Sequence, residues 1–346
     1  MSGNRSLRFG KKNLIVICAA ILLIAALSLL FVILQNIEDR NNIIDVDPGP
    51  EPEIVPVPGE DETPKVIEYN GSKYALRKDL DTLLLIGIDR FEEFIDQQTD
   101  AMSSQQCDFV FLLIFDNTNE TVKAIQLNRE TMVRVVPVDP GEEGYEPLVQ
   151  QLALAQTYGT TSEARCQTTR NAVSTILLDT PIKHYLAFSM DTVAAVNDYY
   201  GGVTLTLSED FSYINPEMQK GVTYTLMGEE ALKYVRARML VGDGSNIARM
   251  ERHREYLQLL LERTKAPENK DKDVTTLFSK IAGYLHSDCT VDELFSYKDR
   301  FDKYSQGDIL VTEGEAVKGK RYMEFYPDAE KLEKLVVDVF YQRIDD

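Results

Sequence analysis

The feature that most constrains this chain is an uninterrupted apolar run from Leu14 to Leu34. Its 21 residues are Leu, Ile, Val, Ala and Phe, with only Cys18 and Ser28 mixed in. A helix of this length crosses the roughly 30 Å hydrocarbon core of a bilayer. The run therefore predicts a transmembrane helix over residues 14–34. A cleavable signal peptide fits less well, because its apolar core is about 7 to 15 residues long and a small-residue cleavage site follows it.

The charges flanking the run predict its orientation. Basic residues precede it and acidic residues follow it: Arg5, Arg8, Lys11 and Lys12 before, Glu38 and Asp39 after. Because positive charge is retained on the cytoplasmic side, we expect residues 1–13 in the cytoplasm and everything after the helix outside. The chain is then a single-pass protein of the plasma membrane.

A change of composition follows the helix. Residues 36–65 contain six of the chain's thirteen prolines and nine acidic residues. Such a segment cannot form a core and tends to extend. We therefore predict an extracellular stalk over residues 35–67 and an ectodomain over residues 68–346 with a helical C-terminal part.

The overall charge excludes some classes of function. The formal net charge is −19, and the 33 basic and 56 acidic residues beyond residue 35 give that part −23. A general nucleic-acid-binding protein needs a basic face, so we expect no nucleic-acid partner. Three histidines without Cys-x-x-Cys or His-x-x-x-His spacing leave few ligands for zinc. The sequence also lacks a Gly-x-Ser-x-Gly elbow and a phosphate-binding loop of the form Gly-x-x-x-x-Gly-Lys-Ser/Thr.

The pattern of apolar residues predicts a layered α/β/α ectodomain with a mixed central sheet. Continuous apolar runs and alternation predict strands at 83–88, 109–115, 122–127, 185–189 and 203–207. Helical spacing predicts helices at 163–178, 191–199, 228–234, 247–263, 274–286, 291–302 and 329–341. Helices interleaved with strands of this kind form layers on a sheet.

Three charged residues flank the first three strands. Asp89 ends the first strand, Asp108 precedes the second, and Arg129 follows the third. If these strands form an antiparallel meander, all three residues emerge at one edge of the sheet. Carboxylates offer oxygen ligands suited to Mg²⁺, and an arginine fork suits phosphate oxygens. The alternative is that the two aspartates are solvated residues at strand ends.

Further arginines lie between residues 236 and 252. Arg236 and Arg238 share a face only if the chain is extended, so we expect it to straighten at Val235 after the helix 228–234. Asn246 is the expected N-cap of the next helix, whose first turn would present free amides to an anion. On that helix Arg249, Arg252, His253 and Tyr256 fall on one face. An exposed basic stripe is the alternative, but this density of arginines in an acidic domain favours an anionic ligand.

Taken in order, several short segments resemble the LytR-CpsA-Psr family. The likeness covers roughly residues 81–261, in the segments Leu84-Leu-Leu-Ile-Gly-Ile-Asp89, Cys107-Asp108, Leu127-Asn-Arg-Glu-Thr131, Gly201-Gly-Val-Thr-Leu205, Tyr234-Val-Arg-Ala-Arg238 and Asn246-Ile-Ala-Arg-Met-Glu-Arg252. The resemblance implies a phosphotransferase that moves an anionic glycopolymer from a polyprenyl-pyrophosphate carrier to peptidoglycan, with Mg²⁺ on the pyrophosphate.

The resemblance also implies roles for individual residues. Asp89 and Asp108 would hold the metal, and five arginines would bind the two phosphates: Arg129, Arg236, Arg238, Arg249 and Arg252. This chain has Glu130, Asn246 and His253 where many members have Asp, Asp and Gln. If the family's Asp at position 246 activates the acceptor hydroxyl, Asp243 is the candidate replacement, so we count Arg129, Arg236, Arg238, Asp243 and Asn246 as candidate catalytic residues.

Three further expectations concern cysteines, lipid and function. Disulfides persist outside the membrane, and of the pairings among Cys107, Cys166 and Cys289 we favour Cys107 with Cys166. A polyprenyl chain needs an apolar tunnel, for which the strands and the helix at 163–178 supply residues. Two other functions remain open, a polyprenyl-pyrophosphate phosphohydrolase with water as acceptor and a non-catalytic envelope-binding regulatory module.

Overall fold

The computed structural model describes residues 65–89, 105–139, 147–269, 272 and 274–344. The predicted cytoplasmic segment, the transmembrane helix at 14–34 and nearly all of the predicted stalk lie outside these residues. Among the described helices, none combines the length and apolar character needed to cross a bilayer.

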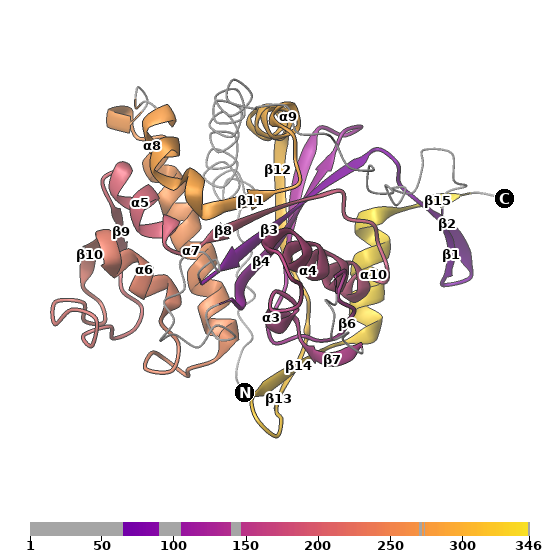
Figure 1. The fold of residues 1–346 in the computed structure, drawn as a ribbon, viewed down its shortest axis with the longest axis horizontal. Coiled ribbons are helices and arrows are strands. Elements are labelled where there is room, and N and C mark those ends of the chain that lie inside the picture. Colours follow the sequence, from indigo (N-terminus) through magenta and orange to yellow (C-terminus); the bar gives the residue numbers. More distant parts are fainter. Residues whose placement is uncertain (1–64, 90–104, 140–146, 270–271, 273, 345–346) are drawn as a thin grey trace, which may run out of the picture.

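A six-stranded mixed sheet forms the centre of the fold (Figure 1). Its order is β11 (Leu285–Ser287), β8 (His184–Ser189), β3 (Leu80–Ile88), β4 (Cys107–Asp116), β5 (Thr121–Gln126) and β12 (Ser305–Val311). Strands β3, β4 and β5 form the predicted antiparallel meander. Strand β8 runs parallel to β3, and β12 runs parallel to β5. The expected mixed α/β sheet is therefore present.

Helices cover both faces of this sheet, because β3 and β4 are apolar on both sides. On one face, Leu84 and Leu112 pack with helices α4 (Ser162–Ile176) and α10 (Ala329–Phe340), and the short helix α3 (Leu152–Ala155) joins them. On the other face, Leu83 and Phe111 pack with α9 (Val291–Lys303). The fold thus has the predicted α/β/α layers.

A third apolar cluster extends the molecule to one side of the sheet, at the left of Figure 1. It contains helices α5 (Thr192–Tyr199), α6 (Gly228–Arg236), α7 (Asn246–Thr264) and α8 (Val274–Ile281), with the ribbon of β9 (Val203–Thr206) and β10 (Thr223–Leu226). Because α7 also packs toward the sheet through Leu257, it connects this helical part to the central layer.

A β-bulge at Asp108 interrupts the pairing of β3 with β4. Gly87 pairs with Phe109 and Ile88 pairs with Cys107, so Asp108 is an extra residue. A Cβ atom at Gly87 would lie 2.8 Å from the Cβ of Phe109, which shows how closely the strands approach here. Bulges bend a strand and redirect a side chain. The bulge therefore determines how Asp108 is presented at the edge of the sheet.

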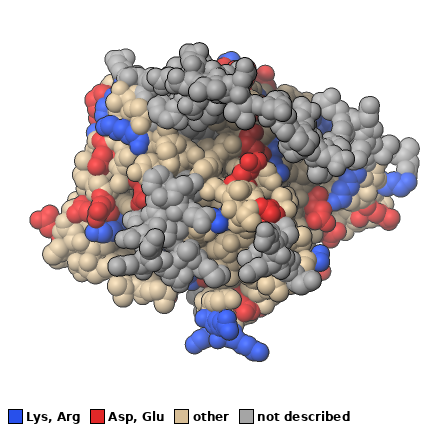
Figure 2. Space-filling view, in the orientation of Figure 1, with Lys and Arg blue, Asp and Glu red and all other residues tan. Residues whose placement is uncertain are grey.

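Three smaller sheets complete the fold. They are β1 (Val66–Tyr69) and β2 (Ser72–Leu76) with β15 (Tyr341–Ile344), β6 (Met132–Val135) with β7 (Leu148–Gln151), and β13 (Gly314–Lys318) with β14 (Met323–Pro327). The predicted boundary between stalk and ectodomain, between residues 67 and 68, falls inside β1. Basic side chains gather at the projecting lower end of the molecule in Figure 2, where Figure 1 places the β13–β14 hairpin with Lys318, Lys320 and Arg321 near its turn.

The C-terminal part differs from the predicted helical tail. The helix expected over 274–286 ends at Ile281, and two short 3-10 turns, at Pro267–Asn269 and Ala282–Tyr284, flank α8. The chain leaves the helix because residues 285–287 pair with β8 as an edge strand. The expectation missed β12 to β15 because these strands have few buried residues and so show no continuous apolar run.

The predicted disulfide between Cys107 and Cys166 is not formed. All three described cysteines are free and buried. The Cys107 thiol donates to the carbonyl oxygens of Leu152 and Ala153 in α3, at 3.6 and 3.7 Å. The Cys166 sulfur accepts from Nε2 of Gln156, which caps the same helix. Each sulfur thus contacts the α3 segment, and burial raises the pKa of both thiols to about 12.

Candidate anion-binding site

Four arginines and three carboxylates meet at one edge of the central sheet, and we call them the arginine cluster. They are Arg129, Arg236, Arg238 and Arg249 with Asp89, Asp108 and Glu130. Arg129 follows β5, Arg236 ends α6, and Arg249 lies in the first turn of α7. The antiparallel meander brings the ends of β3 and β5 beside the start of β4, which confirms the predicted shared edge.

Asp108 joins two of these arginines. Its Oδ1 accepts from Nη1 of Arg129, and its Oδ2 lies 3.0 Å from Nη1 of Arg249. Arg129 also donates to Oε1 of Gln106, a residue that the sequence patterns did not single out. Asp108 is therefore a bridging carboxylate rather than a solvated strand end, and its position depends on the bulge.

The other two arginines each have a carboxylate of their own. Arg236 contacts Oδ1 of Asp89 through Nε at 3.1 Å and Nη2 at 2.6 Å. Arg238 donates to Oε1 of the buried Glu130 and to the Gly244 carbonyl. The chain straightens at Ala237, with φ −53° and ψ 132°, two residues later than expected, because Val235 is still packed within α6.

Desolvation and mutual repulsion lower the pKa of two arginines in the cluster. The pKa of Arg129 falls to about 10, first because the side chain is desolvated and then because Arg249 and Arg238 repel it. The pKa of Arg249 also falls to about 10, from desolvation and from Arg238. Both guanidinia remain charged at neutral pH. An incoming anion would relieve their mutual repulsion, which is a physical reason for anion binding.

Asn246 holds Arg249 and Asn128 together. Its Oδ1 accepts from Nη2 of Arg249 at 2.6 Å, and its Nδ2 donates to Oδ1 of Asn128 at 2.7 Å. The N-cap of α7 is Ser245, whose side chain accepts from the Ala248 amide, so the expectation that Asn246 caps the helix is wrong by one residue. Ser245 takes the extended conformation that a cap requires. Asn246 is thus a positioning residue within the first turn.

Arg252 and His253 contact the backbone of the segment that carries Arg236 and Arg238. Arg252 donates through Nη2 to the Ala237 carbonyl and lies over the rings of Phe211 and Tyr234, at 5.5 and 5.7 Å. Nε2 of His253 lies 2.8 Å from the Val235 carbonyl. Through these contacts α7 fixes residues 235–237. The predicted phosphate contact of Arg252 remains a prediction.

Asp243 lies in an exposed turn before α7. Its carboxylate accepts from the Ser245 amide at 2.8 Å, and this hydrogen bond lowers the pKa of Asp243. A carboxylate with a lowered pKa is a weaker base. A base role for Asp243 therefore remains a prediction.

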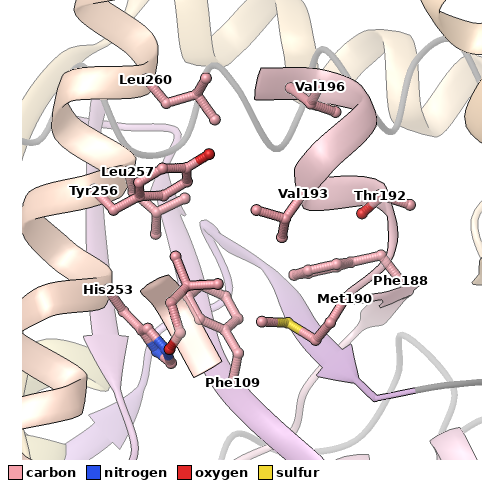
Figure 3. A pocket seen from close by; sticks show the side chains of 11 residues that line it. Phe109, Phe188, Met190, Thr192, Val193, Val196, His253, Tyr256, Leu257 and Leu260 are labelled. Carbon is pink, nitrogen blue, oxygen red and sulfur yellow. The ribbon is translucent and has the colours of Figure 1, made fainter. Parts of the chain in front are cut away.

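An apolar cavity of about 50 Å³ lies beside the cluster (Figure 3). Figure 3 shows His253, Tyr256, Leu257 and Leu260 of α7 on one side and Val193 and Val196 of α5 on the other. Phe109, Phe188 and Met190 lie between these helices at the end of the sheet. The helix predicted at 163–178 does not line it, because α4 packs on the opposite face of the sheet.

The predicted Mg²⁺ ligands Asp89 and Asp108 belong to the cluster, where arginines pair with both, so the metal site remains a prediction. Asp89 and Asp108 offer carboxylate oxygens at the same sheet edge, as Mg²⁺ prefers. Among the described residues, His184, Asp288 and Cys289 also bring potential ligand atoms within 4.8 Å of one another. Asp288, however, is bound to Arg170 and to the Tyr185 amide, and this group lies at the opposite end of β8.

A family model and curated proteins both match this chain, and they point to the same family. Residues 59–336 match the LytR_cpsA_psr family. The polyisoprenyl-teichoic acid–peptidoglycan teichoic acid transferase TagU of Halalkalibacterium halodurans is 26% identical over 183 residues, 53% of each chain. Its counterpart TagT of Bacillus subtilis is 26% identical over 218 residues, 60% of this chain and 58% of TagT. The chain thus spans a little over half the length of these relatives.

Solved structures share the fold. Bacillus subtilis TagT superposes with a TM-score of 0.53 at 21% identity, covering 76% of this chain and 90% of TagT. TagT bound to LI-WTA gives 0.52 at 20%, with the same coverage. Protein gbs0355 of Streptococcus agalactiae gives 0.59 at 18%, covering 75% of this chain and 87% of that chain. The arrangement of helices around a mixed sheet is therefore common to all of them.

Proposed function

Because the chain belongs to the LytR-CpsA-Psr family, we propose that it is a membrane-anchored phosphotransferase acting outside the plasma membrane. It transfers an anionic glycopolymer from a polyprenyl-pyrophosphate carrier to peptidoglycan. The observation that carries this proposal is the arginine cluster, in which four guanidinia from three separate segments meet at one sheet edge. Relatives named as teichoic acid transferases support the same class of reaction.

The cluster has the chemistry that a pyrophosphate requires. Guanidinium groups form bidentate, charge-assisted hydrogen bonds with phosphate oxygens. Arg249 is buried and Arg129 is half-buried, and their positive charges repel each other, so both gain most from an added anion. Arg236 and Arg238 are more exposed, with side-chain accessibilities of 34% and 21%, so solvent and an entering substrate can reach them.

The apolar cavity supports a lipid carrier. Val235 and His253 line it, and the next residue after Val235 is Arg236 of the cluster. A ligand with an apolar chain in the cavity would therefore present its phosphates to the arginines directly. A polyprenyl pyrophosphate has this combination of a long apolar tail and a doubly charged head.

The reaction is the attack of an acceptor hydroxyl on a phosphoric anhydride. The hydroxyl oxygen bonds to the phosphorus that carries the polymer, and the bond from that phosphorus to the bridging oxygen breaks. The bridging oxygen leaves with the lipid as polyprenyl monophosphate, while the hydroxyl proton passes to solvent. Guanidinia stabilise the negative charge that develops on the leaving phosphate.

Asp89 and Asp108 are the residues that would hold Mg²⁺. When bound, the ion would neutralise charge on the pyrophosphate oxygens. In the described structure these carboxylates pair with Arg236, Arg129 and Arg249. Their pairing keeps the arginines in place at the sheet edge before the substrate arrives.

Substituting the exposed arginines tests the proposal. We expect Arg236→Ala or Arg238→Ala to lower transfer roughly 100-fold, on the order of 3 kcal/mol, because a charge-assisted phosphate contact is lost. Lysine should restore activity only in part, since a point charge does not reproduce the fork. The assay measures transfer of labelled polymer from a short-chain polyprenyl-pyrophosphate donor to peptidoglycan fragments by the full chain in detergent.

Arg134→Ala is the matched control, because Arg134 is an exposed arginine on β6. Asp89→Ala and Asp108→Ala should instead weaken the dependence on Mg²⁺, and added Mg²⁺ should partly rescue either one but not both together. Release of polymer phosphate without any sugar acceptor would indicate a phosphohydrolase. If all four single variants fold and retain wild-type turnover, the cluster is a solvated surface and the proposal fails.

A further inference from the structure

A second cavity, of about 690 Å³, lies between α7 and the β13–β14 hairpin, on the side of α7 away from the apolar cavity. Its lining mixes polar and apolar side chains, and the polar ones include Asn128, Glu251, Arg254, Thr312, Glu313 and Tyr326. We call it the polar cleft. Its size suits an elongated ligand of several rings, since ligand pockets commonly measure about 300 to 1,000 Å³.

The polar cleft begins at the arginine cluster. Asn128 lines it, and Oδ1 of Asn128 accepts from Nδ2 of Asn246 at 2.7 Å. Asn246 in turn contacts Arg249. A ligand that fills the cleft would therefore end two side chains away from a guanidinium of the cluster. This is where the second substrate of a transfer reaction has to lie.

A buried hydroxyl in the cleft wall has no partner within the described structure. Thr312 is only 8% exposed and lines the cleft, and its Oγ1 makes no hydrogen bond there. Leaving a buried hydroxyl unsatisfied costs about 1 to 3 kcal/mol. A ligand that offers hydroxyl or amide groups would remove this penalty on binding.

The charge of the cleft discriminates between the two substrates. Four carboxylates line it against two basic side chains: Glu251, Glu313, Glu315 and Asp328 against Arg254 and Lys331. This balance repels an anionic polymer, whereas carboxylate oxygens accept hydrogen bonds from sugar hydroxyls. Tyr326 is 47% exposed, and its hydroxyl is fixed by Glu324 at 2.8 Å, so its ring offers an apolar surface for a sugar.

From these features we infer that the polar cleft binds the acceptor, an uncharged stretch of N-acetylhexosamine glycan strand. The inference rests on the proposed function, because it assigns the cleft to the second substrate of that reaction. The hydroxyl-rich strand lies along Tyr326 and Thr312, and its reacting end points past Asn128 toward the cluster. The anionic donor polymer leaves the cluster by another path.

Binding of chitotetraose, an uncharged tetramer of N-acetylglucosamine, tests the cleft without requiring catalysis. Isothermal titration calorimetry on the full chain in detergent should show at least fivefold weaker binding for Tyr326→Ala. Tyr322→Ala is the matched control, since Tyr322 is an exposed tyrosine of the same hairpin that does not line the cleft. It should bind as the wild type does.

Thr312→Val separates a ligand contact from a structural role. Because the hydroxyl has no partner in the described structure, its removal should leave urea stability equal or higher while weakening chitotetraose binding about threefold or more. If Thr312→Val lowers stability and leaves binding unchanged, the hydroxyl is structural and its part of the inference fails.

Steady-state transfer distinguishes the inference from the proposed function. Tyr326→Ala should raise KM for the peptidoglycan acceptor and leave KM for the lipid donor unchanged. A raised donor KM would instead place the anionic polymer in the cleft and overturn the inference, as would a wild type that does not bind chitotetraose. If the wild type binds chitotetraose through Tyr326 but transfers nothing, the proposed function fails and the glycan site stands.

Discussion

At the scale of single residues, the arginine cluster is nearly balanced in charge before any ligand binds. Four guanidinia face three carboxylates, and each carboxylate is already paired. Substituting Arg236 or Arg238 therefore also leaves its carboxylate partner without an arginine. Glu130 has a side-chain accessibility of 4% and Asp89 one of 21%. Arg238→Ala should consequently destabilise the fold more than Arg236→Ala does, since an unpaired buried charge is costly.

The buried histidine predicts a specific pH dependence of stability. The pKa of His253 falls to about 3, mainly from burial and then from the nearby charge of Arg249. The unfolded chain, with a histidine pKa near 6.5, binds a proton that the folded protein does not. The contribution of His253 to the free energy of unfolding is therefore complete above pH 6.5. It is lost as the pH falls toward 3, at about 1.4 kcal/mol per pH unit.

Urea unfolding of the wild type and His253→Gln between pH 7 and pH 4 measures this contribution. Glutamine cannot titrate, and its amide is able to hydrogen-bond to the Val235 carbonyl as the ring does. The free energy of unfolding of the variant should thus fall less steeply with decreasing pH. Parallel profiles for the two proteins would show that His253 titrates normally in the folded state.

At the scale of elements, α7 serves every part of the site from different faces. Its first turn supplies Arg249 to the cluster, and Tyr256 and Leu260 line the apolar cavity. Glu251 and Arg254 line the polar cleft. In the proposed reaction, this one helix would position the lipid donor, the phosphates and the acceptor relative to one another. This explains why charged and apolar residues alternate so densely along it.

Filling the apolar cavity tests its assignment to the lipid. Val193 projects into the cavity from α5, so Val193→Phe should occupy the space of about 50 Å³ that a polyprenyl chain enters. We expect KM for a long-chain donor to rise at least tenfold, while KM for a short-chain donor changes little. Val149→Phe on the exposed strand β7 is the control. Equal effects on both donors would contradict a lipid site here.

The sequence predicted those elements in which buried residues follow one another along the chain. The apolar runs of β3 and β4 identified the meander, and the meander placed Asp89, Asp108 and Arg129 at one edge. The bulge at Asp108 could not be predicted, because it depends on how two strands register against each other. The backbone contact of Arg252 was equally hidden, since its acceptor, the Ala237 carbonyl, is a backbone atom that no residue pattern marks.

At the scale of the whole molecule, the proposed function requires the domain to lie outside the membrane that holds its lipid substrate. The charge pattern around residues 14–34 predicts this topology, and those residues lie outside the described structure. Protease added to intact cells should digest the part beyond residue 65 and spare the first dozen residues. Detergent-permeabilised cells are the control, in which the N-terminal segment should also be cut. Protection of the part beyond residue 65 in intact cells would contradict the topology.

The pairing of early strands with late ones also has a consequence for the timing of folding. Strand β15 pairs with β2, and β12 pairs with β5. Neither sheet can therefore be completed until strands from the C-terminal part of the described chain are available. In a chain synthesised from its N-terminus, the edge of β5 would stay unpaired until β12, which begins at Ser305, is available. Open strand edges recruit other chains. The rate at which these late strands become available, as well as final stability, therefore affects how much folded protein accumulates.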